Sequence, residues 1–356
     1  MKKLLAIVII VSGFASTSFA GNKDRAGQAG ASELLINPWS RSSGWNGLNT
    51  AGAMGLEAMN LNVAGLAGTK KTEILFSRTN WLAGSGVNIN AFGFSQKLGE
   101  NEDAGVLGLS VMSVGFGDID ITTSSLPEGG IGTYSPQFVN VALGYAKIFS
   151  KSIYGGFTIK GISESISDVT AMGLALDAGV QYKTGKKDRL KFGVVLRNIG
   201  TPMKYGGDGL SFRANGTETG ATTPNTYSMT VEQRTQGFEL PSMLNIGCSY
   251  DLFSGKEGNN RLTFAGNFTS NSFSNDQLGL GLEYSIKELF MLRAGYNYEK
   301  GILSNTDRVT VMTGIAAGLT VDVPVKAGGP QISLDYSYRS TNPWNGIHSV
   351  GIRITL

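Results

Sequence analysis

Apolar and polar side chains alternate along fourteen stretches of the chain, each about ten residues long. A period of two places one set of side chains on each face of a β-strand. Because a lipid bilayer offers no hydrogen-bond partner to a free N–H or C=O group, a sheet that spans it must close on itself. We therefore predict an all-β fold, a 14-stranded antiparallel transmembrane β-barrel. One of the clearest stretches, 172–182, has the apolar set Met172, Leu174, Leu176, Ala178, Val180 and Tyr182.

The connections between the stretches alternate in length, which gives a second argument for a barrel. Every second connection is short, whereas long ones occur at 117–136 and 199–241. Short turns face the periplasm in bacterial barrels and long loops face outside, so we expect both termini in the periplasm. A phase shift between Ala91 and Phe92 predicts a bulge in the second strand. The predicted strands are 72–81, 86–98, 104–116, 137–148, 152–165, 170–183, 189–198, 242–252, 260–273, 276–286, 289–298, 308–321, 331–339 and 347–356.

The chain divides into three predicted regions. Residues 1–20 have two lysines, an apolar core and Ser18-Phe19-Ala20, as in a secretory signal peptide. Residues 21–70 lack strand alternation and are rich in Gly, Ala, Asn and Ser. We predict that they fold into the bore as a hatch or plug, the alternative being a periplasmic tail. Residues 71–356 would form the barrel, in contact with the lipid of the outer membrane.

Composition excludes several classes of site. Removal of the signal peptide would leave 28 basic and 27 acidic residues, so charge gives no reason to expect a nucleic-acid partner. A single cysteine, Cys248, excludes an internal disulfide, and a single histidine, His348, excludes a Cys/His zinc cluster. Ser349, next to His348, would point to the opposite face of its strand, so no Ser-His pair forms there. We predict that the chain is not an enzyme and needs no cofactor or metal.

Ten charged residues fall on the predicted inner face. They could line a charged translocation path, or they could pair with one another in a bore too wide for side chains alone to fill, and we favour pairing. Asp118 and Asp120 could hold calcium, but they lack the further ligands of a calcium loop, which favours a solvated loop. The ten residues are Lys160, Glu164, Asp177, Lys191, Arg197, Glu283, Arg293, Asp335, Arg339 and Arg353.

Five aromatic residues are candidate contacts for a partner or ligand. Trp39 and Trp45 lie in the predicted hatch, and Phe212, Tyr227 and Phe238 lie in the long connection at 199–241. Loops of that length usually have a function, here constricting the bore or binding a partner. The tripeptide Asn-Pro-Trp occurs at 37–39 and at 342–344, where turn chemistry is a simpler explanation than a repeated docking motif.

Several blocks of sequence resemble the PorV/PorQ family of outer-membrane proteins, within the FadL-like barrel superfamily. They are ASELLI at 31–36, NVAGLA at 62–67, TEILFSRTNWL at 72–82, GFGDI at 115–119, RNIG at 197–200 and Leu240-Pro241. Two positions depart from the family pattern. Val63 replaces the proline of Asn-Pro-Ala, and Leu356 replaces the usual terminal aromatic residue.

The resemblance implies a fourteen-stranded barrel with an amino-terminal hatch. It also implies a role in the type IX protein secretion of Bacteroidota, through binding of a larger translocon barrel or of secreted cargo protein. We expect a non-enzymatic protein of this kind. The alternative is a FadL-like channel for the uptake of hydrophobic small molecules, in which hatch and loops contact a hydrophobic ligand.

Overall fold

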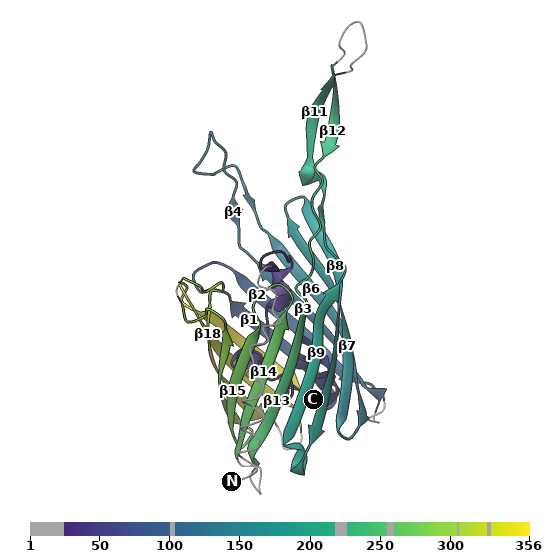
Figure 1. The fold of residues 1–356 in the computed structure, drawn as a ribbon, viewed down its shortest axis with the longest axis vertical. Helices are drawn as coiled ribbons and strands as arrows, with labels where there is room; N and C mark the ends of the chain where they lie inside the picture. The colour runs from purple at the N-terminus through teal and green to yellow at the C-terminus, as the bar shows by residue number, and fades with distance from the viewer. Residues whose placement is uncertain (1–24, 100–103, 218–225, 255–259, 305, 326–328) are drawn as a thin grey trace.

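The computed structural model describes residues 25–99, 104–217, 226–254, 260–304, 306–325 and 329–356. The predicted signal peptide, 1–20, lies outside these ranges. Fourteen antiparallel strands form the wall (Figure 1). They are β1 (Thr72–Asn80), β2 (Asn88–Lys97), β3 (Val106–Gly115), β6 (Gln137–Ser150), β7 (Ile153–Ile166), β8 (Val169–Thr184), β9 (Leu190–Gly200), β13 (Met243–Ser254), β14 (Asn260–Asn271), β15 (Gln277–Ile286), β16 (Phe290–Glu299), β17 (Met312–Pro324), β18 (Gln331–Thr341) and β19 (Ile347–Thr355).

The wall is closed, as the alternation predicts. Each strand pairs with its neighbour along the wall, and β19 returns to pair with β1 from Glu73↔Thr355 to Asn80↔His348. Closure satisfies the backbone groups that an open edge would leave unpaired in hydrocarbon. All fourteen predicted strands are present. The largest difference is at β17, which begins at Met312 rather than at 308, and its pairing with β18 shifts register between Met312 and Ala316.

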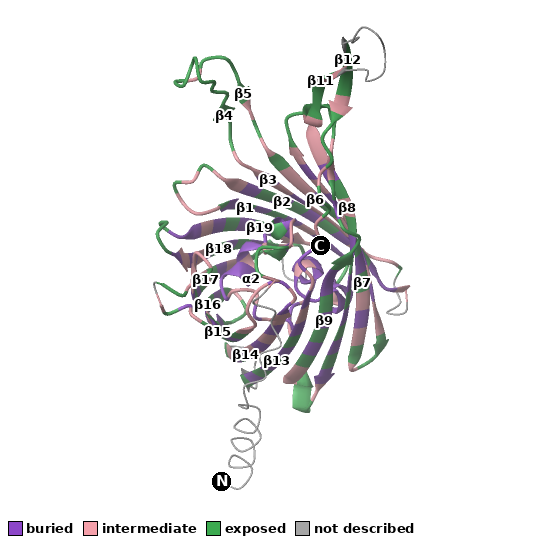
Figure 2. Cartoon of the chain, turned by 45° about the horizontal axis from the view of Figure 1, so that its top comes forward, coloured by how far each residue is buried: buried purple, intermediate pink, exposed green. Residues whose placement is uncertain are grey.

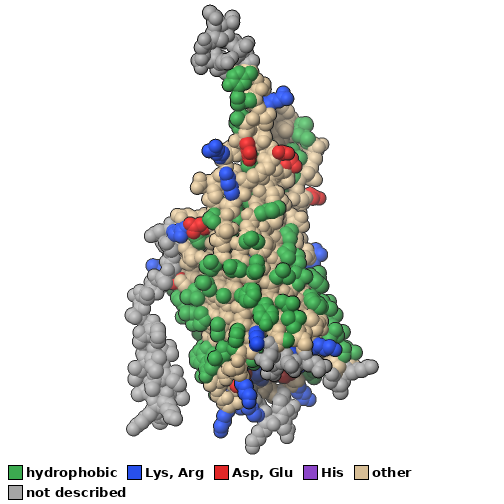
Figure 3. Space-filling model, turned by 90° about the vertical axis from the view of Figure 1, so that its right-hand side faces the viewer, with side chains coloured by type: hydrophobic (Ala, Val, Ile, Leu, Met, Phe, Trp, Pro, Cys, Tyr) green, Lys and Arg blue, Asp and Glu red, His purple; other side chains and the backbone are tan. Residues whose placement is uncertain are grey.

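The predicted facing of the side chains is confirmed on the strands that alternate most clearly. On β8 the side chain of Met172 is 72% exposed, whereas Asp177 is 2% exposed. Figure 2 shows the resulting stripes of buried and exposed residues along the strands. Hydrophobic side chains cover the outer wall, and most charged side chains lie above or below this band (Figure 3). This surface is the one that a barrel presents to lipid.

The predicted bulge between Ala91 and Phe92 is wrong. The pairing of β2 with both β1 and β3 runs through these residues without a shift in register. Ile89 and Ala91 are buried on the inner face, while Phe92 and Phe94 point outward. The sequence changes phase because apolar residues line the inner wall at this point, and not because the strand bends.

Long excursions gather at one end of the barrel, here called the loop end, and short connections at the other, the turn end (Figure 1). The 116–136 excursion contains the small hairpin of β4 (Ile119–Asp120) and β5 (Thr133–Tyr134). The 201–242 excursion contains β10 (Tyr205–Gly206), which extends the wall beside β8. It also contains a separate hairpin of β11 (Ser211–Thr217) and β12 (Thr226–Glu232).

Residues 25–71 pack inside the barrel rather than beside it (Figure 2). They contain short helices: η2 (Ser32–Leu35), α2 (Ser40–Ser43), η3 (Leu56–Asn60) and η4 (Val63–Gly68). Helix α2 contacts β17, β18 and β19, and η4 contacts the opposite side of the wall, at β6, β7 and β8. The inner segment therefore bridges the bore. In the described residues no helix has the length and apolarity needed to cross a membrane.

Glycines on the inner face of the wall make room for this segment. A Cβ at Gly295 would lie 2.8 Å from the Cα of Trp45, and one at Gly193 would lie 2.5 Å from the carbonyl oxygen of Thr50. Gly247 faces Thr50 in the same way, with 2.9 Å between its added Cβ and the threonine Cβ. The high glycine content therefore has a steric cause, because the chain inside the bore approaches the backbone of the wall.

We predict that Gly295→Ala lowers the free energy of unfolding by about 1–3 kcal/mol, because the added methyl group overpacks the contact with Trp45. The matched control is Gly266→Ala, where the nearest atom, on the outward Leu280 side chain, is 3.8 Å from the added Cβ. Urea unfolding in lipid vesicles would measure both. Equal stability of the two variants would contradict the packing of residues 25–71 against the wall.

Candidate functional site

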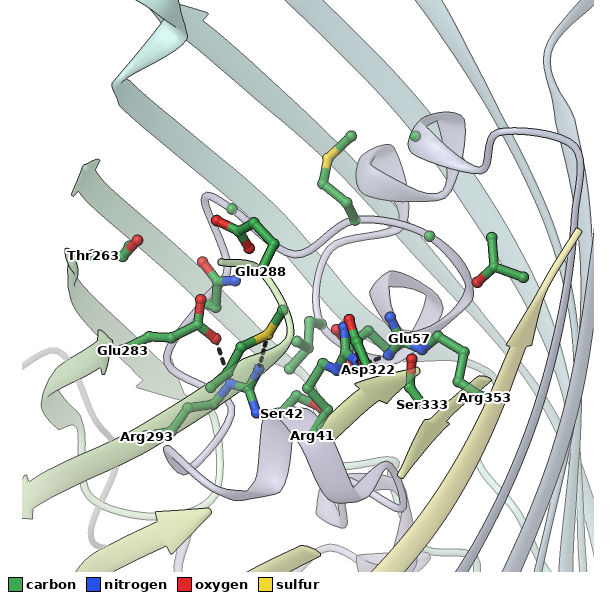
Figure 4. A pocket seen from close by; sticks show the side chains of 18 of the residues that line it. Arg41, Ser42, Glu57, Thr263, Glu283, Glu288, Arg293, Asp322, Ser333 and Arg353 are labelled. Atoms are coloured by element: carbon green, nitrogen blue, oxygen red, sulfur yellow. Dashed lines mark hydrogen bonds and ion pairs between the residues drawn. The ribbon is translucent and has the colours of Figure 1, made fainter. Parts of the chain in front are cut away.

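The bore contains a polar cavity of about 360 Å³ at the turn end, between the inner segment and the wall (Figure 4). Residues of the inner segment close one side of it, and the wall side comes mainly from strands β9, β14 to β19 and β1. The charged residues among those lining it are Arg41, Glu57, Lys70, Glu73, Lys191, Arg261, Glu283, Glu288, Arg293, Asp322 and Arg353.

Most charges around this cavity are paired. Arg41 Nη2 lies 2.9 Å from Asp322 Oδ1, and its Nε lies 3.0 Å from Asp335 Oδ1. Burial alone would lower the pKa of Arg41, but Asp335, Asp322 and Glu57 together raise it above its usual value. Arg353 lies 3.3 Å from Glu57 of the inner segment. These pairs join the inner segment to the wall, as in the paired-charge interpretation of the sequence.

A second charged cluster lies within the wall at the bulge between β8 and β9. Lys160 Nζ is 2.5 Å from Asp177 Oδ2 and 2.8 Å from the side-chain oxygen of Asn198. Asn198 has a left-handed backbone conformation, with φ of 59°, and its backbone N–H donates to Asp177 Oδ1 at 2.8 Å. Arg197 donates to the carbonyl oxygen of Leu34, in the inner segment, at 3.4 Å. The cluster holds the bulge and ties it to the chain inside the bore.

At the loop end the inner wall has an apolar patch on β2, β3 and β6. Ile89, Met112 and Val114 form a buried cluster, against which pack Ile36 of the inner segment and the half-buried aromatic residues Trp81, Phe116 and Phe138. The rings of Phe116 and Phe138 meet edge to face, with centroids 4.9 Å apart. We call this set the loop-end apolar cluster. It is unexpected in a barrel, whose inner face is normally polar.

Arg339 stands beside this cluster with an unsatisfied guanidinium. Its Cζ lies 5.2 Å from the centre of the Trp81 ring, and the residue is 9% exposed. Its Nε and Nη2 have no hydrogen-bond partner in the described part of the chain. A buried cation without a carboxylate partner is costly, and Arg339 is one of the inner charged residues that lack a partner of opposite charge in the described part of the chain. An apolar surface beside a buried cation suits a ligand with an apolar body and an anionic end.

The structure separates the five predicted contact residues into two groups. Trp39 and Trp45 are 1% and 3% exposed and pack within the inner segment and against the wall. Phe238 is half-buried, with its ring centre 5.5 Å from that of Tyr205. Phe212 and Tyr227 are 54% and 47% exposed on the β11–β12 hairpin. Only this last pair presents its side chains to solvent at the loop end.

The β11–β12 hairpin has one apolar face. Its register pairs Phe212 with Val231, Ala214 with Met229 and Gly216 with Tyr227, so all six lie on one side. The tyrosine ring lies across Gly216, where an added Cβ would be 2.6 Å from its Cζ. The opposite face carries polar residues, among them Arg213 and Ser228. The strands pair only with each other, and Figure 1 shows the hairpin well beyond the end of the wall.

Two minor motifs gain no support as sites. Asp118 accepts a hydrogen bond from Ser135, and the described residues contain no group of three or more Asp, Glu, His or Cys placed to hold a metal ion. The two Asn-Pro-Trp copies differ in environment. Trp39 is buried in the inner segment, whereas Trp344 is 40% exposed in the connection before β19.

No family model and no curated protein matches the chain. Solved structures do match. The Pseudomonas putida toluene transporter TodX is 10% identical, with a TM-score of 0.56, and the match covers 90% of this chain and 97% of that one. The Ralstonia pickettii toluene transporter TbuX is 12% identical, with a TM-score of 0.52 and the same coverage. The monoaromatic hydrocarbon channel CymD is 13% identical, with a TM-score of 0.50.

These matches show a shared fold. Like them, the chain is a closed β-barrel, here with a wall of fourteen antiparallel strands. At 10–13% identity the matches carry no residue-level information about a substrate.

We predict that Arg41→Met lowers the free energy of unfolding by about 3–5 kcal/mol, because it leaves Asp322 and Asp335 without their buried partner. The control is Arg25→Met, since the Arg25–Glu239 pair is exposed at the surface and should contribute about 0–1 kcal/mol. Urea titration of each purified variant in vesicles gives both values. Equal losses in the two variants would mean that Arg41 does not anchor the inner segment.

Proposed function

We propose that the protein is a non-enzymatic outer-membrane channel for the uptake of hydrophobic small molecules. The observation that carries the proposal is the loop-end apolar cluster, a group of aliphatic and aromatic side chains at the end of the bore where the long connections gather. A polar bore repels a hydrocarbon, whereas a patch of aromatic and aliphatic side chains gives it a favourable contact. Three structural neighbours with the same fold are named as channels or transporters for toluene or other monoaromatic hydrocarbons.

In this proposal residues 21–70 act as a hatch. The loop end faces the cell exterior and both termini face the periplasm, following the pattern of long loops and short turns. A ligand arriving from outside meets the loop-end apolar cluster first, and then the inner segment at Ile36. In this orientation the polar cavity at the turn end lies on the periplasmic side of the inner segment.

Arg339 narrows the class of ligand. A neutral hydrocarbon leaves its guanidinium unsatisfied, but the carboxylate of an amphipathic acid can accept hydrogen bonds from it while the acyl chain lies on the cluster. Hydrogen bonds to charged groups contribute about 1.5–3 kcal/mol, which corresponds to a roughly 10–100-fold difference in affinity. The proposed ligand is therefore an apolar molecule with one anionic group.

Binding of laurate and of dodecanol to the protein in lipid nanodiscs would test this. We predict that Arg339→Met weakens laurate binding about 10–100-fold and leaves dodecanol binding within about threefold. Arg78→Met is the matched control, because Arg78 lies on the outer face of β1 at the same end. Empty nanodiscs correct for partition into lipid. Binding no stronger than to empty discs, or equal losses for the two probes, would refute the proposal.

The apolar face of the β11–β12 hairpin favours a second candidate function, the binding of another protein. An exposed face with Phe212, Tyr227 and Met229 is typical of a recognition surface. In this reading the protein is a PorV/PorQ-type component of type IX secretion, and the face contacts a translocon barrel or secreted cargo. The support is the resemblance of the sequence blocks together with this face.

Gentle detergent extraction of a tagged protein would test the second candidate. We predict that the amount of translocon barrel that co-purifies falls at least tenfold in the double variant Phe212→Ser, Met229→Thr. Secretion of type IX cargo should also fall in this variant. The polar-face variant Arg213→Ser, Thr230→Ser should retain both, since it alters the same two strands on the opposite side. Normal secretion by a strain that lacks the whole protein would exclude this function.

A further inference from the structure

Two buried glutamates meet where the inner segment touches the wall near the loop end. Glu33, on η2, is 2% exposed, and Glu164, on β7, is 3% exposed. Glu164 stands in a row of inward positions across four strands, because Phe138 of β6 pairs with Glu164, Glu164 with Ala171 of β8, and Ala171 with Tyr205 of β10. Glu33, in the inner segment, interacts with Glu164 and Tyr205 of this row.

Neither carboxyl group has a cationic partner among the residues that the structure describes. Glu164 accepts a hydrogen bond from the Tyr205 hydroxyl. Neither oxygen of Glu33 makes a hydrogen bond of ordinary geometry to a described residue. The side-chain amide of Asn140, on β6, lies close enough to Glu33 to favour its ionised form, but this effect is smaller than those of burial and of Glu164. Two inward cations on this side of the wall are already engaged, Lys160 with Asp177 and Arg197 with Leu34 and Asp177.

Two ionised carboxylates cannot remain in contact in a buried site without a positive charge, but one proton between them removes the conflict. The protonated acid donates a hydrogen bond, and the remaining carboxylate accepts it together with that of Tyr205. Burial, and secondly the charge of Glu164, raise the pKa of Glu33 to about 8. Burial and the hydrogen bond to Glu164 also raise the pKa of Tyr205, which keeps its hydroxyl a donor.

We propose that Glu33 and Glu164 share one proton and thereby form a pH-dependent latch that holds residues 31–36 of the inner segment against the wall. Residues 31–36 also make two apolar contacts with the rest of the protein. Leu34 packs in a cluster with Met203 and Leu240, and Ile36 packs on the loop-end apolar cluster. Loss of the proton detaches both contacts, because they belong to the same short stretch of chain.

The direction of the pH dependence follows from proton linkage. A released Glu33 is in water and returns to its ordinary pKa of 4.5, whereas the docked residue holds its proton up to about pH 8. Docking is therefore strongest below pH 4.5, and weakens progressively from pH 4.5 to pH 8 as the released state loses its proton first. In this window each pH unit raises the ratio of released to docked segment by up to about tenfold.

Thiol labelling measures this ratio in the full chain in nanodiscs, with no ligand present, so the result does not depend on the proposed uptake or secretion functions. In a Cys248→Ser background, Leu34→Cys places a thiol at a site that is 4% exposed. Leu35→Cys, at a neighbouring site that is 44% exposed, corrects for the effect of pH on the thiol itself. A membrane-impermeant methanethiosulfonate reagent is the probe.

We predict that the Leu34→Cys rate, divided by the Leu35→Cys rate, rises at least tenfold between pH 6 and pH 9. Glu33→Gln should abolish the rise, Glu164→Gln should move its midpoint to lower pH, and Glu57→Gln should leave it unchanged, since Glu57 pairs with Arg353 elsewhere in the bore. Heat-modifiable migration on gels confirms that each variant is folded. A constant ratio, or a rise that persists in Glu33→Gln, would overturn the latch.

Discussion

The absence of water in the bilayer core is the constraint on which the structure depends. Every N–H and C=O group of the wall must find a partner within the protein, and only a closed ladder achieves this for strands. The pairing of β19 with β1 completes that ladder. Because the pleat alternates, successive side chains of each strand face lipid and bore in turn. This alternation does not determine how the inside of the bore is packed.

Closing fourteen strands creates a bore that side chains alone cannot fill. Here the chain fills much of it with its own residues 25–71, and the wall adapts by losing side chains where that segment approaches. Gly193, Gly247 and Gly295 each meet the backbone or the Cβ of residues 45–51. The glycines of the wall therefore allow the inner segment to pack closely against the backbone of the strands. Ion pairs of Arg41 and Arg353 then hold the segment in one orientation.

The wall could be predicted from the sequence because side chains that face lipid are apolar and most of those that face the bore are polar. In a β-strand this difference gives a period of two. Met172 and Asp177 of β8 illustrate this difference. The prediction failed at Ile89 and Ala91, because a period of two reports only that a face is apolar and not which face it is. Ile89 and Ala91 are apolar residues on the inner face, and the bulge was predicted wrongly because the inner face was assumed to be polar.

The sequence also predicted that interior charges pair with one another, but it did not show which charged groups remain without a partner. Arg339 and Glu33 are ordinary residues in the sequence, and their lack of partners appears only when their three-dimensional neighbours are known. A buried group without a partner costs free energy that pairing elsewhere in the bore avoids. Both exceptions lie toward the loop end, where Ile36 of the inner segment meets the apolar cluster. The paired charges at the turn end join the inner segment to the wall, whereas these two groups without a partner among the described residues lie toward the loop end.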